Sequence, residues 1–198
     1  MAKSGTLHPP THLIACGVFR AALEHLQLQR KHPQLRLTFL TSKLHLRPKE
    51  LEVVLSQEII SSQERHERTV CLYGMCFPNI DDCCGQHGAK RVPGLHCYEM
   101  LLGREKYQHI IEETPGTYFV ERDIILNFDE YCLSPLELHD KEMLRWFFSN
   151  YQKVLYLRQP SDPDLLPRVH KLADFLQLSL VTRDADYSEI ERMLLELI

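Results

Sequence analysis

Several signatures of common protein classes are missing from this sequence of 198 residues. No stretch approaches the roughly 20 apolar residues that a membrane-spanning helix needs. Residues 1–19 also lack the apolar core of a secretory signal peptide. We therefore expect a cytoplasmic protein that does not enter a membrane. Because 27 acidic residues outnumber 23 basic ones, there is no cationic excess to displace counterions from nucleic acid, and we expect no nucleic-acid partner.

The short motifs of well-known chemistries are missing as well. There is no G-x-x-x-x-G-K-[ST] and no G-x-G-x-x-G, which are the usual phosphate-binding loops. Neither a G-x-S-x-G nucleophile elbow nor an H-E-x-x-H zinc motif occurs. Any site must therefore be assembled from residues that are distant in the sequence.

Cysteine and histidine are the residues that this sequence has in unusual number. It contains 7 Cys and 11 His in a composition that is otherwise ordinary, with 44% hydrophobic and 25% charged residues. Disulfides are rare in the cytoplasm, so these thiols are candidates for core packing, metal binding or redox chemistry. The odd number of cysteines fits those roles better than a complete disulfide framework.

Strand-like and helix-like segments alternate along the chain. Such alternation favours an α/β fold with a mainly parallel, Rossmann-like sheet and helices on both faces. We predict a flexible N-terminal arm over residues 1–11 and a single α/β domain over residues 12–198. Apolar and β-branched runs predict strands at 12–15, 35–40, 69–73, 117–120, 153–157 and 178–181, with a polar loop after residue 73 and a helix from Pro135 to Asn150.

Reactive side chains follow several of the predicted strands. Cys16 comes directly after the first strand, His45 lies in the loop after the second, and Cys76 follows the third. Cys97 and its neighbour His96 come after the long loop that leaves the third strand. Because ligands of open α/β sheets bind outside the carboxyl ends of the strands, we expect these side chains to meet at one edge.

This predicted ligand set fits two kinds of metal centre. Three thiolates and one imidazole are the ligands of a tetrahedral zinc site, and a firm bond from His45 would favour zinc. Three cysteines from separate loops can instead hold an iron–sulfur cluster, and the wide spacing of Cys16, Cys76 and Cys97 slightly favours the cluster. Two alternatives stay open: thiols that only pack in the core, and a thiol enzyme with Cys76 or Cys16 as its nucleophile.

The remaining cysteines are better explained without chemistry. Cys71 lies inside a predicted strand and Cys132 is isolated, so both are expected in the core. Cys83 and Cys84 are adjacent in the polar loop, where we expect them to lie at the surface.

The order of several segments resembles a known family. The segments are IACGVFRAALEHL, LHLRPKELEVVLSQEI, VCLYGMC, GLHCYEMLLGREKY and PGTYFV. They resemble the domain-of-unknown-function family numbered sixteen thirty-eight over most of the chain, and only thinly after residue 120. The cysteine and histidine positions of the family pattern fall on Cys16, His45, Cys76 and Cys97. The chain departs from the pattern at His96, where the family has Asp, and at ERDII, where the family has Gly-Trp.

The resemblance also implies a cellular setting. Members of that family are often encoded near corrinoid-dependent methyltransferases, which implies methyl-transfer or metallocofactor metabolism. The expected partner is a small-molecule or cofactor ligand, with Gly17, Arg47 and Tyr73 as candidate contacts. The alternative is a non-catalytic accessory protein that docks on a larger metalloenzyme.

Overall fold

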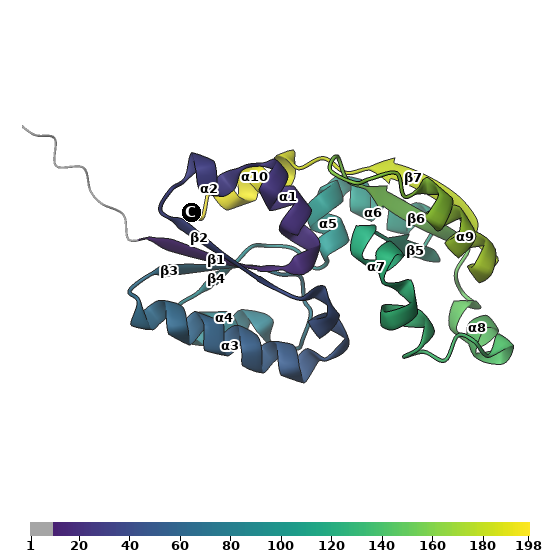
Figure 1. Cartoon of the computed structure of the whole chain (residues 1–198), viewed down its shortest axis with the longest axis horizontal. Helices are drawn as coiled ribbons and strands as arrows, with labels where there is room; N and C mark the ends of the chain where they lie inside the picture. The colour runs from purple at the N-terminus through teal and green to yellow at the C-terminus, as the bar shows by residue number, and fades with distance from the viewer. Residues whose placement is uncertain (1–9) are drawn as a thin grey trace, which may run out of the picture. The chain divides into compact units, whose positions relative to one another are not determined.

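The computed structural model describes residues 10–198, which form two compact units (Figure 1). The first unit runs to Pro93 and also takes in Met193–Ile198, and the second unit is Gly94–Arg192. Both contain parallel strands and helices, which confirms the predicted α/β class. The single domain over residues 12–198 stays a prediction. The predicted arm lies outside the described residues except for Pro10 and Thr11, and Thr11 already belongs to the first strand.

The first unit is a parallel sheet between two layers of helices. Its elements are β1 (Thr11–Cys16), η1 (Gly17–Phe19), α1 (Arg20–His25), α2 (Leu28–Lys31), β2 (Leu35–Leu40), η2 (Ser42–Leu46), α3 (Pro48–Glu64), β3 (Arg68–Leu72), α4 (Ile80–Gln86) and β4 (Lys90–Arg91). The strand order within these residues is β2-β1-β3-β4. Helices α1 and α2 cover one face, and α3 and α4 cover the other (Figure 1). Ala15 pairs with Phe39 of β2 and Leu72 of β3, so the three strands end nearly level.

Strand β1 carries apolar side chains on both faces of the sheet, which explains why helices cover both faces. Successive residues of a strand point to opposite faces, and Leu13, Ile14 and Ala15 are all 0% exposed. Ile14 packs with Leu51 and Leu55, which belong to the apolar stripe of α3. Burial of each such Leu or Ile side chain stabilises the fold by about 1.5–3 kcal/mol relative to exposure.

The second unit has a parallel sheet of its own, with strand order β5-β6-β7 in the described residues. Its elements are α5 (Cys97–Leu102), α6 (Arg104–Glu113), β5 (Thr117–Val120), α7 (Arg122–Leu126), the π-helical turn η3 (Asp129–Leu133), α8 (Lys141–Phe148), β6 (Lys153–Arg158), α9 (Leu166–Leu176), β7 (Ser179–Asp184) and α10 (Ser188–Leu195), which ends in the first unit. On one face, Val120 and Val154 pack with residues of α7, α8 and α9. On the other face, Phe119 stacks on Tyr98 of α5 and contacts Tyr107 of α6. Helices therefore cover both faces of this sheet too.

The helix predicted from Pro135 is wrong at its start. It begins at Lys141 instead, because the side chain of Asp140 accepts hydrogen bonds from the backbone N–H groups of Glu142 (2.7 Å) and Met143 (3.0 Å). A capping carboxylate of this kind fixes where a helix starts. Pro135 is compatible with a first helical turn, but it lies six residues before the first residue of α8.

The polar loop predicted after residue 73 is also wrong in part, because it contains α4. Cys84 is 1% exposed and belongs to the core between sheet and helices, and Cys83 packs against that core. Both cysteines therefore lie on a helix and not in a surface loop. The acidic residues and the glycine of this segment gave it the composition of a loop. The apolar spacing from Ile80 to Cys84 is the helical signal that they obscured.

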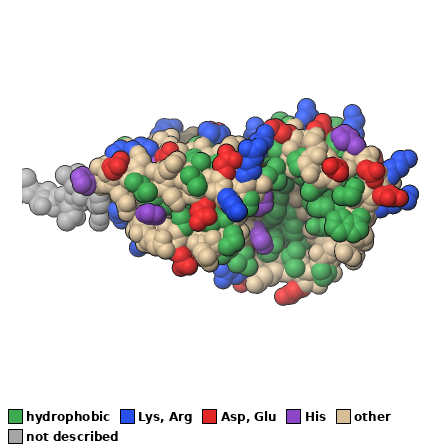
Figure 2. Space-filling model, turned by 90° about the horizontal axis from the view of Figure 1, so that it is seen from below, with side chains coloured by type: hydrophobic (Ala, Val, Ile, Leu, Met, Phe, Trp, Pro, Cys, Tyr) green, Lys and Arg blue, Asp and Glu red, His purple; other side chains and the backbone are tan. Residues whose placement is uncertain are grey.

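The surface of the described residues mixes both signs of charge with apolar patches. In residues 10–198 no helix has the length and apolar character that a membrane crossing requires. Figure 2 shows Lys, Arg, Asp and Glu side chains interspersed on the face in view, and hydrophobic side chains gathered on the second unit. The most exposed large apolar side chain in the described residues is Trp146 of α8, at 73%.

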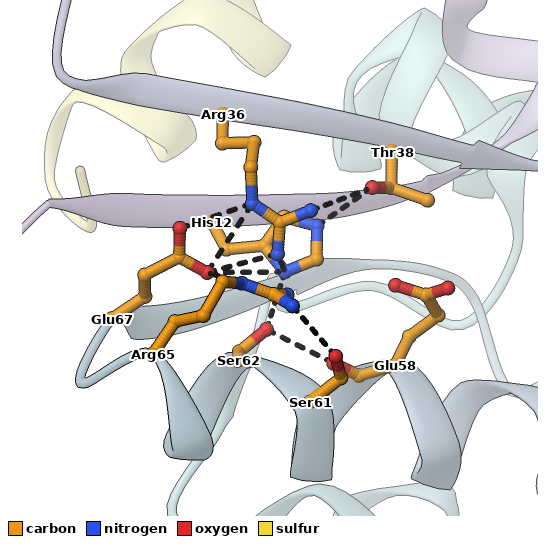
Figure 3. Close-up of polar contacts among 8 residues, drawn as sticks. All are labelled: His12, Arg36, Thr38, Glu58, Ser61, Ser62, Arg65 and Glu67. Carbon is orange, nitrogen blue, oxygen red and sulfur yellow. Dashed lines mark hydrogen bonds and ion pairs between the residues drawn. The ribbon is translucent and has the colours of Figure 1, made fainter.

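A buried histidine of β1 joins β2 to α3 (Figure 3). His12 is 0% exposed, with Nε2 2.8 Å from Thr38 Oγ1 and Nδ1 in a hydrogen bond with Ser62 Oγ. Arg36 donates to Glu67 from Nε (3.0 Å) and Nη2 (2.8 Å), and its Nη2 lies 2.5 Å from His12 Nδ1. Burial, and next the charge of Arg36, lower the pKa of His12 to about 4. The ring is therefore neutral at pH 7.

Neutral His12 should make the first unit less stable as the pH falls. The unfolded chain binds a proton near pH 6.5, whereas the folded pKa is about 4. The stabilisation is therefore complete above pH 6.5 and is lost between pH 6.5 and pH 4. We expect the free energy of unfolding to fall by about 2 kcal/mol through this residue between pH 7 and pH 5. Urea unfolding of wild type and His12→Gln measures it, and a difference between them that does not change with pH would contradict it.

Candidate thiol site at the strand ends

The carboxyl ends of β1 and β3 bring two cysteines to the same edge of the first sheet. Cys16 is the last residue of β1, and Cys76 lies in the segment that follows β3. The two strands are adjacent and parallel. Both thiols are half-buried and pack against the core cluster on the α3 and α4 face. The edge predicted from the sequence is therefore where the structure places these two residues.

Gly17 lets the chain turn directly after Cys16. A Cβ at this position would lie 3.2 Å from the backbone O of Leu40 and 3.2 Å from the backbone N of Ser42. Because both neighbours are backbone atoms, they cannot move aside as a flexible side chain would. Glycine therefore permits the close approach of the chain after β1 to the end of β2, and it fixes how Cys16 leaves the strand.

Arg91 holds the loop that carries Cys76. Its Nη1 donates to the backbone O of Tyr73 (2.8 Å), while Nε and Nη2 donate to the two carboxylate oxygens of Asp81 (2.6 and 3.1 Å). The guanidinium lowers the pKa of Asp81. Burial raises the pKa of Cys76, and the backbone of Gly74 and the charge of Arg91 oppose that rise. Arg91 thus both orders the loop and supplies positive charge near the thiol.

The hydroxyl of Tyr73 is buried beside the thiols. Tyr73 is 1% exposed, and its Oη has no hydrogen-bond partner within residues 10–198. Burial raises its pKa far above the usual value, and Cys16, Cys71 and Cys76 add to the rise. The phenol is therefore neutral and keeps a proton that it could donate to a bound group. An unpaired buried hydroxyl costs about 1–3 kcal/mol, which a bound group that accepts its hydrogen bond would recover.

The other thiols of the first unit lie deeper in the core. Cys71 is 0% exposed, as its position inside a strand predicts. A hydrogen bond between Cys71 and Cys84 raises the pKa of Cys71 and lowers the pKa of Cys84. Cys83 Sγ lies 3.2 Å from Ser56 Oγ of α3. Cys132 is buried in the core of the second unit, also as predicted.

The remaining predicted site residues lie in η2, just before α3, and in the second unit. His45 is exposed in η2, and exposed Arg47 forms an ion pair with Glu50 (Nη1–Oε2 3.2 Å). His96 precedes α5 and Cys97 begins it, both in the second unit. In the part of the chain that the structure describes, no three His, Cys, Asp or Glu side chains are grouped closely enough to hold a metal ion. Joint binding by Cys97 and the first-unit thiols stays a prediction.

The side chains at this edge are of a kind that can bind soft metals. Thiolates prefer zinc, copper(I) and iron–sulfur clusters over hard ions. Cys16 at the end of β1 and Cys76 after β3 could supply two such thiolates, and the neutral phenol of Tyr73 is a group that could donate a hydrogen bond to a bound group. The edge therefore fits two protein ligands of a soft centre and one supporting hydrogen bond.

Removal of the Tyr73 hydroxyl should not cost stability in the metal-free protein. Tyr73→Phe deletes a buried polar atom without a partner among the described residues. We expect a free energy of unfolding between the wild-type value and about 3 kcal/mol above it. Chemical denaturation measures this. A loss of more than about 1 kcal/mol would show that the hydroxyl has a structural hydrogen bond.

A second polar cluster, which the sequence motifs did not reveal, lies at the strand ends of the second unit. Glu121 directly follows β5, is 2% exposed, and accepts hydrogen bonds from the N–H groups of Asp123 (2.8 Å) and Ile124 (3.1 Å). Gln159 follows β6 and is also 2% exposed. Gln159 Nε2 and Asp162 Oδ1 have no hydrogen-bond partner in the described residues. The sequence signal for this cluster is a polar residue directly after a strand. The search for such residues has to include carboxyl and amide groups as well as thiols.

Burial of Glu121 should lower the free energy of unfolding as the pH rises towards 8. Burial raises its folded pKa to about 8 from 4.5, so the stabilisation of the neutral acid is complete below pH 4.5 and is lost as the pH rises towards 8. Glu121→Gln keeps a neutral side chain with an acceptor oxygen. We expect its free energy of unfolding, relative to wild type, to rise by about 3 kcal/mol between pH 5 and pH 8. Denaturation at the two pH values measures it, and an unchanged difference would mean that folded Glu121 is already ionised.

Three comparisons with known proteins bear on this chain. A family model described as a protein of unknown function, DUF1638, matches residues 39–194. The curated proteins and the solved structures contain no match to the chain. The matched range includes His45, Tyr73, Cys76 and Cys97, and it begins after Cys16 and Gly17.

Proposed function

We propose that this chain, which belongs to the DUF1638 family, binds a metal ion or an iron–sulfur cluster at the strand carboxyl ends of its first unit. Cys16 and Cys76 supply thiolate ligands. The remaining coordination positions are assigned to Cys97 and to His45 or His96 on the sequence pattern alone. Gly17, Tyr73 and Arg47 are assigned to contacts with the bound group or its small-molecule ligand.

One observation carries the proposal: two half-buried thiols, one at the end of β1 and one in the segment after the adjacent parallel strand β3, lie near a buried hydroxyl that lacks a partner within residues 10–198. Core packing alone gives no reason for Tyr73 to bury its hydroxyl unpaired, because an unmade hydrogen bond is costly. A metal-bound thiolate or a cluster sulfide beside Tyr73 Oη would accept that bond. The donor set thus supports a soft metal centre.

The thiol chemistry favours a metal centre over a cysteine nucleophile. A nucleophilic cysteine needs a lowered pKa, whereas burial raises the pKa of Cys76. Metal coordination deprotonates a thiol outright and so overcomes this rise. Between the two centres, an iron–sulfur cluster remains slightly preferred over zinc because the three predicted cysteines come from three separate segments. Either centre suits a role in methyl-transfer or metallocofactor metabolism.

Anaerobic purification followed by iron, sulfide and zinc analysis tests the proposal. We expect one centre per chain, with visible charge-transfer absorption for a cluster and none for zinc. Cys16→Ser and Cys76→Ser should each weaken zinc binding by more than about 100-fold or abolish cluster assembly. Tyr73→Phe should weaken binding by about tenfold, because it removes only a supporting hydrogen bond.

The matched control is Cys132→Ser in the core of the second unit. Cys132 is also a buried free thiol, and its Sγ lies 3.4 Å from Tyr118 Oη, so the variant changes the same atom without touching the proposed ligands. It should bind as wild type does. A chain purified without oxygen that carries neither metal and takes up neither on reconstitution would refute the proposal.

A further inference from the structure

The second unit contains a cavity of about 510 Å³ beside α8 and α9. This volume lies within the range of small-molecule sites, roughly 300–1,000 Å³. Most of the lining is apolar, and its buried members, Leu138, Phe148 and Leu176, belong to the core of this unit. His139, Lys141 and Arg145 also line it.

The polar part of the lining carries one sign of charge. Lys141 and Arg145 are exposed at the cavity, and among the lining residues that the structure describes there is no Asp or Glu. Neither cation has an ion-pair partner within residues 10–198. Asp140, which precedes α8, uses its carboxylate to cap the helix, and Glu142 forms no ion pair with either cation in this part of the chain.

The position of the two cations on α8 is unfavourable without a counter-charge. Lys141 and Arg145 are four residues apart, so they lie on the same side of the helix and repel each other. Lys141 is also the first residue of α8, where the helix dipole disfavours a cation. An anion held between the two side chains would relieve both effects.

We propose that this cavity binds a medium-chain alkyl carboxylate. The hydrocarbon chain lies against the apolar lining, and the carboxylate lies between Lys141 and Arg145. The charged lining residues all come from the stretch His139–Arg145, at one side of an otherwise apolar cavity. That asymmetry matches a ligand with a single anionic end. A nucleotide would need polar contacts along its whole length, which the apolar lining does not offer.

Trp146 provides a reporter for the test. It is the single tryptophan of the sequence, it follows Arg145 on α8, and it is 73% exposed. The full-length protein is titrated with decanoate below the micelle concentration, by tryptophan fluorescence and by calorimetry. Decanol, which has the same chain and no charge, is the matched ligand. We expect saturable binding of one decanoate per chain and weaker binding of decanol.

Two sets of variants separate the charge from the apolar lining. Lys141→Gln with Arg145→Gln should weaken decanoate binding by about tenfold or more and leave decanol binding unchanged. Both side chains are exposed, so folding should be unaffected, which circular dichroism checks. Lys171→Gln, an exposed cation of α9 that does not line the cavity, is the control and should bind as wild type. Non-saturable binding, equal affinity for the two ligands, or wild-type decanoate affinity in the double variant would each overturn the proposal.

Discussion

Parallel pairing of β1 with β3 is the constraint on which the candidate site depends. Parallel strands end on the same side of a sheet, so Cys16 and the segment that carries Cys76 reach one edge although sixty residues of sequence separate them. Parallel sheets are normally covered by helices on both faces, so their strands need apolar side chains on both faces. Ile14 and its neighbours in β1 meet that requirement. The positions of the two thiols at one edge therefore depend on the same apolar packing.

Much of the architecture follows from local residue patterns. The strand at 35–40 and the strand at 117–120 have the predicted bounds, because each is a β-branched or apolar run flanked by turn residues. Local patterns do not predict where α8 starts, because one capping carboxylate decides it. They also do not predict α4, because its acidic residues and glycine give it the composition of a loop. The boundary between the two compact units does not follow from local patterns either. Continuous alternation of strands and helices carries no signal of where one core ends and the next begins.

The site was predictable only to the extent that strand order is. Placement after a strand identified Cys16 and Cys76. The sequence around Tyr73, however, does not indicate that its hydroxyl is buried without a partner in the described residues. Glu121 shows the same limit, because a carboxyl group after a strand is usually solvated and here is 2% exposed. Burial depends on packing between segments that are distant in the chain, and it is burial that moves the pKa values of His12, Glu121 and Cys76. Sequence patterns therefore locate reactive groups more readily than they describe their protonation.

The outer strand β4 has a consequence for the behaviour of the protein in a crowded solution. It contains only Lys90 and Arg91, it lies at the edge of the first sheet, and the side chain of Arg91 is turned back onto Asp81 and the backbone of Tyr73. A long apolar edge strand would offer its free backbone groups to the sheet of another molecule. A two-residue edge with a cationic side chain offers few such groups and repels a like copy of itself. The arginine that orders the thiol loop therefore belongs to an edge strand that also protects this side of the sheet against aggregation.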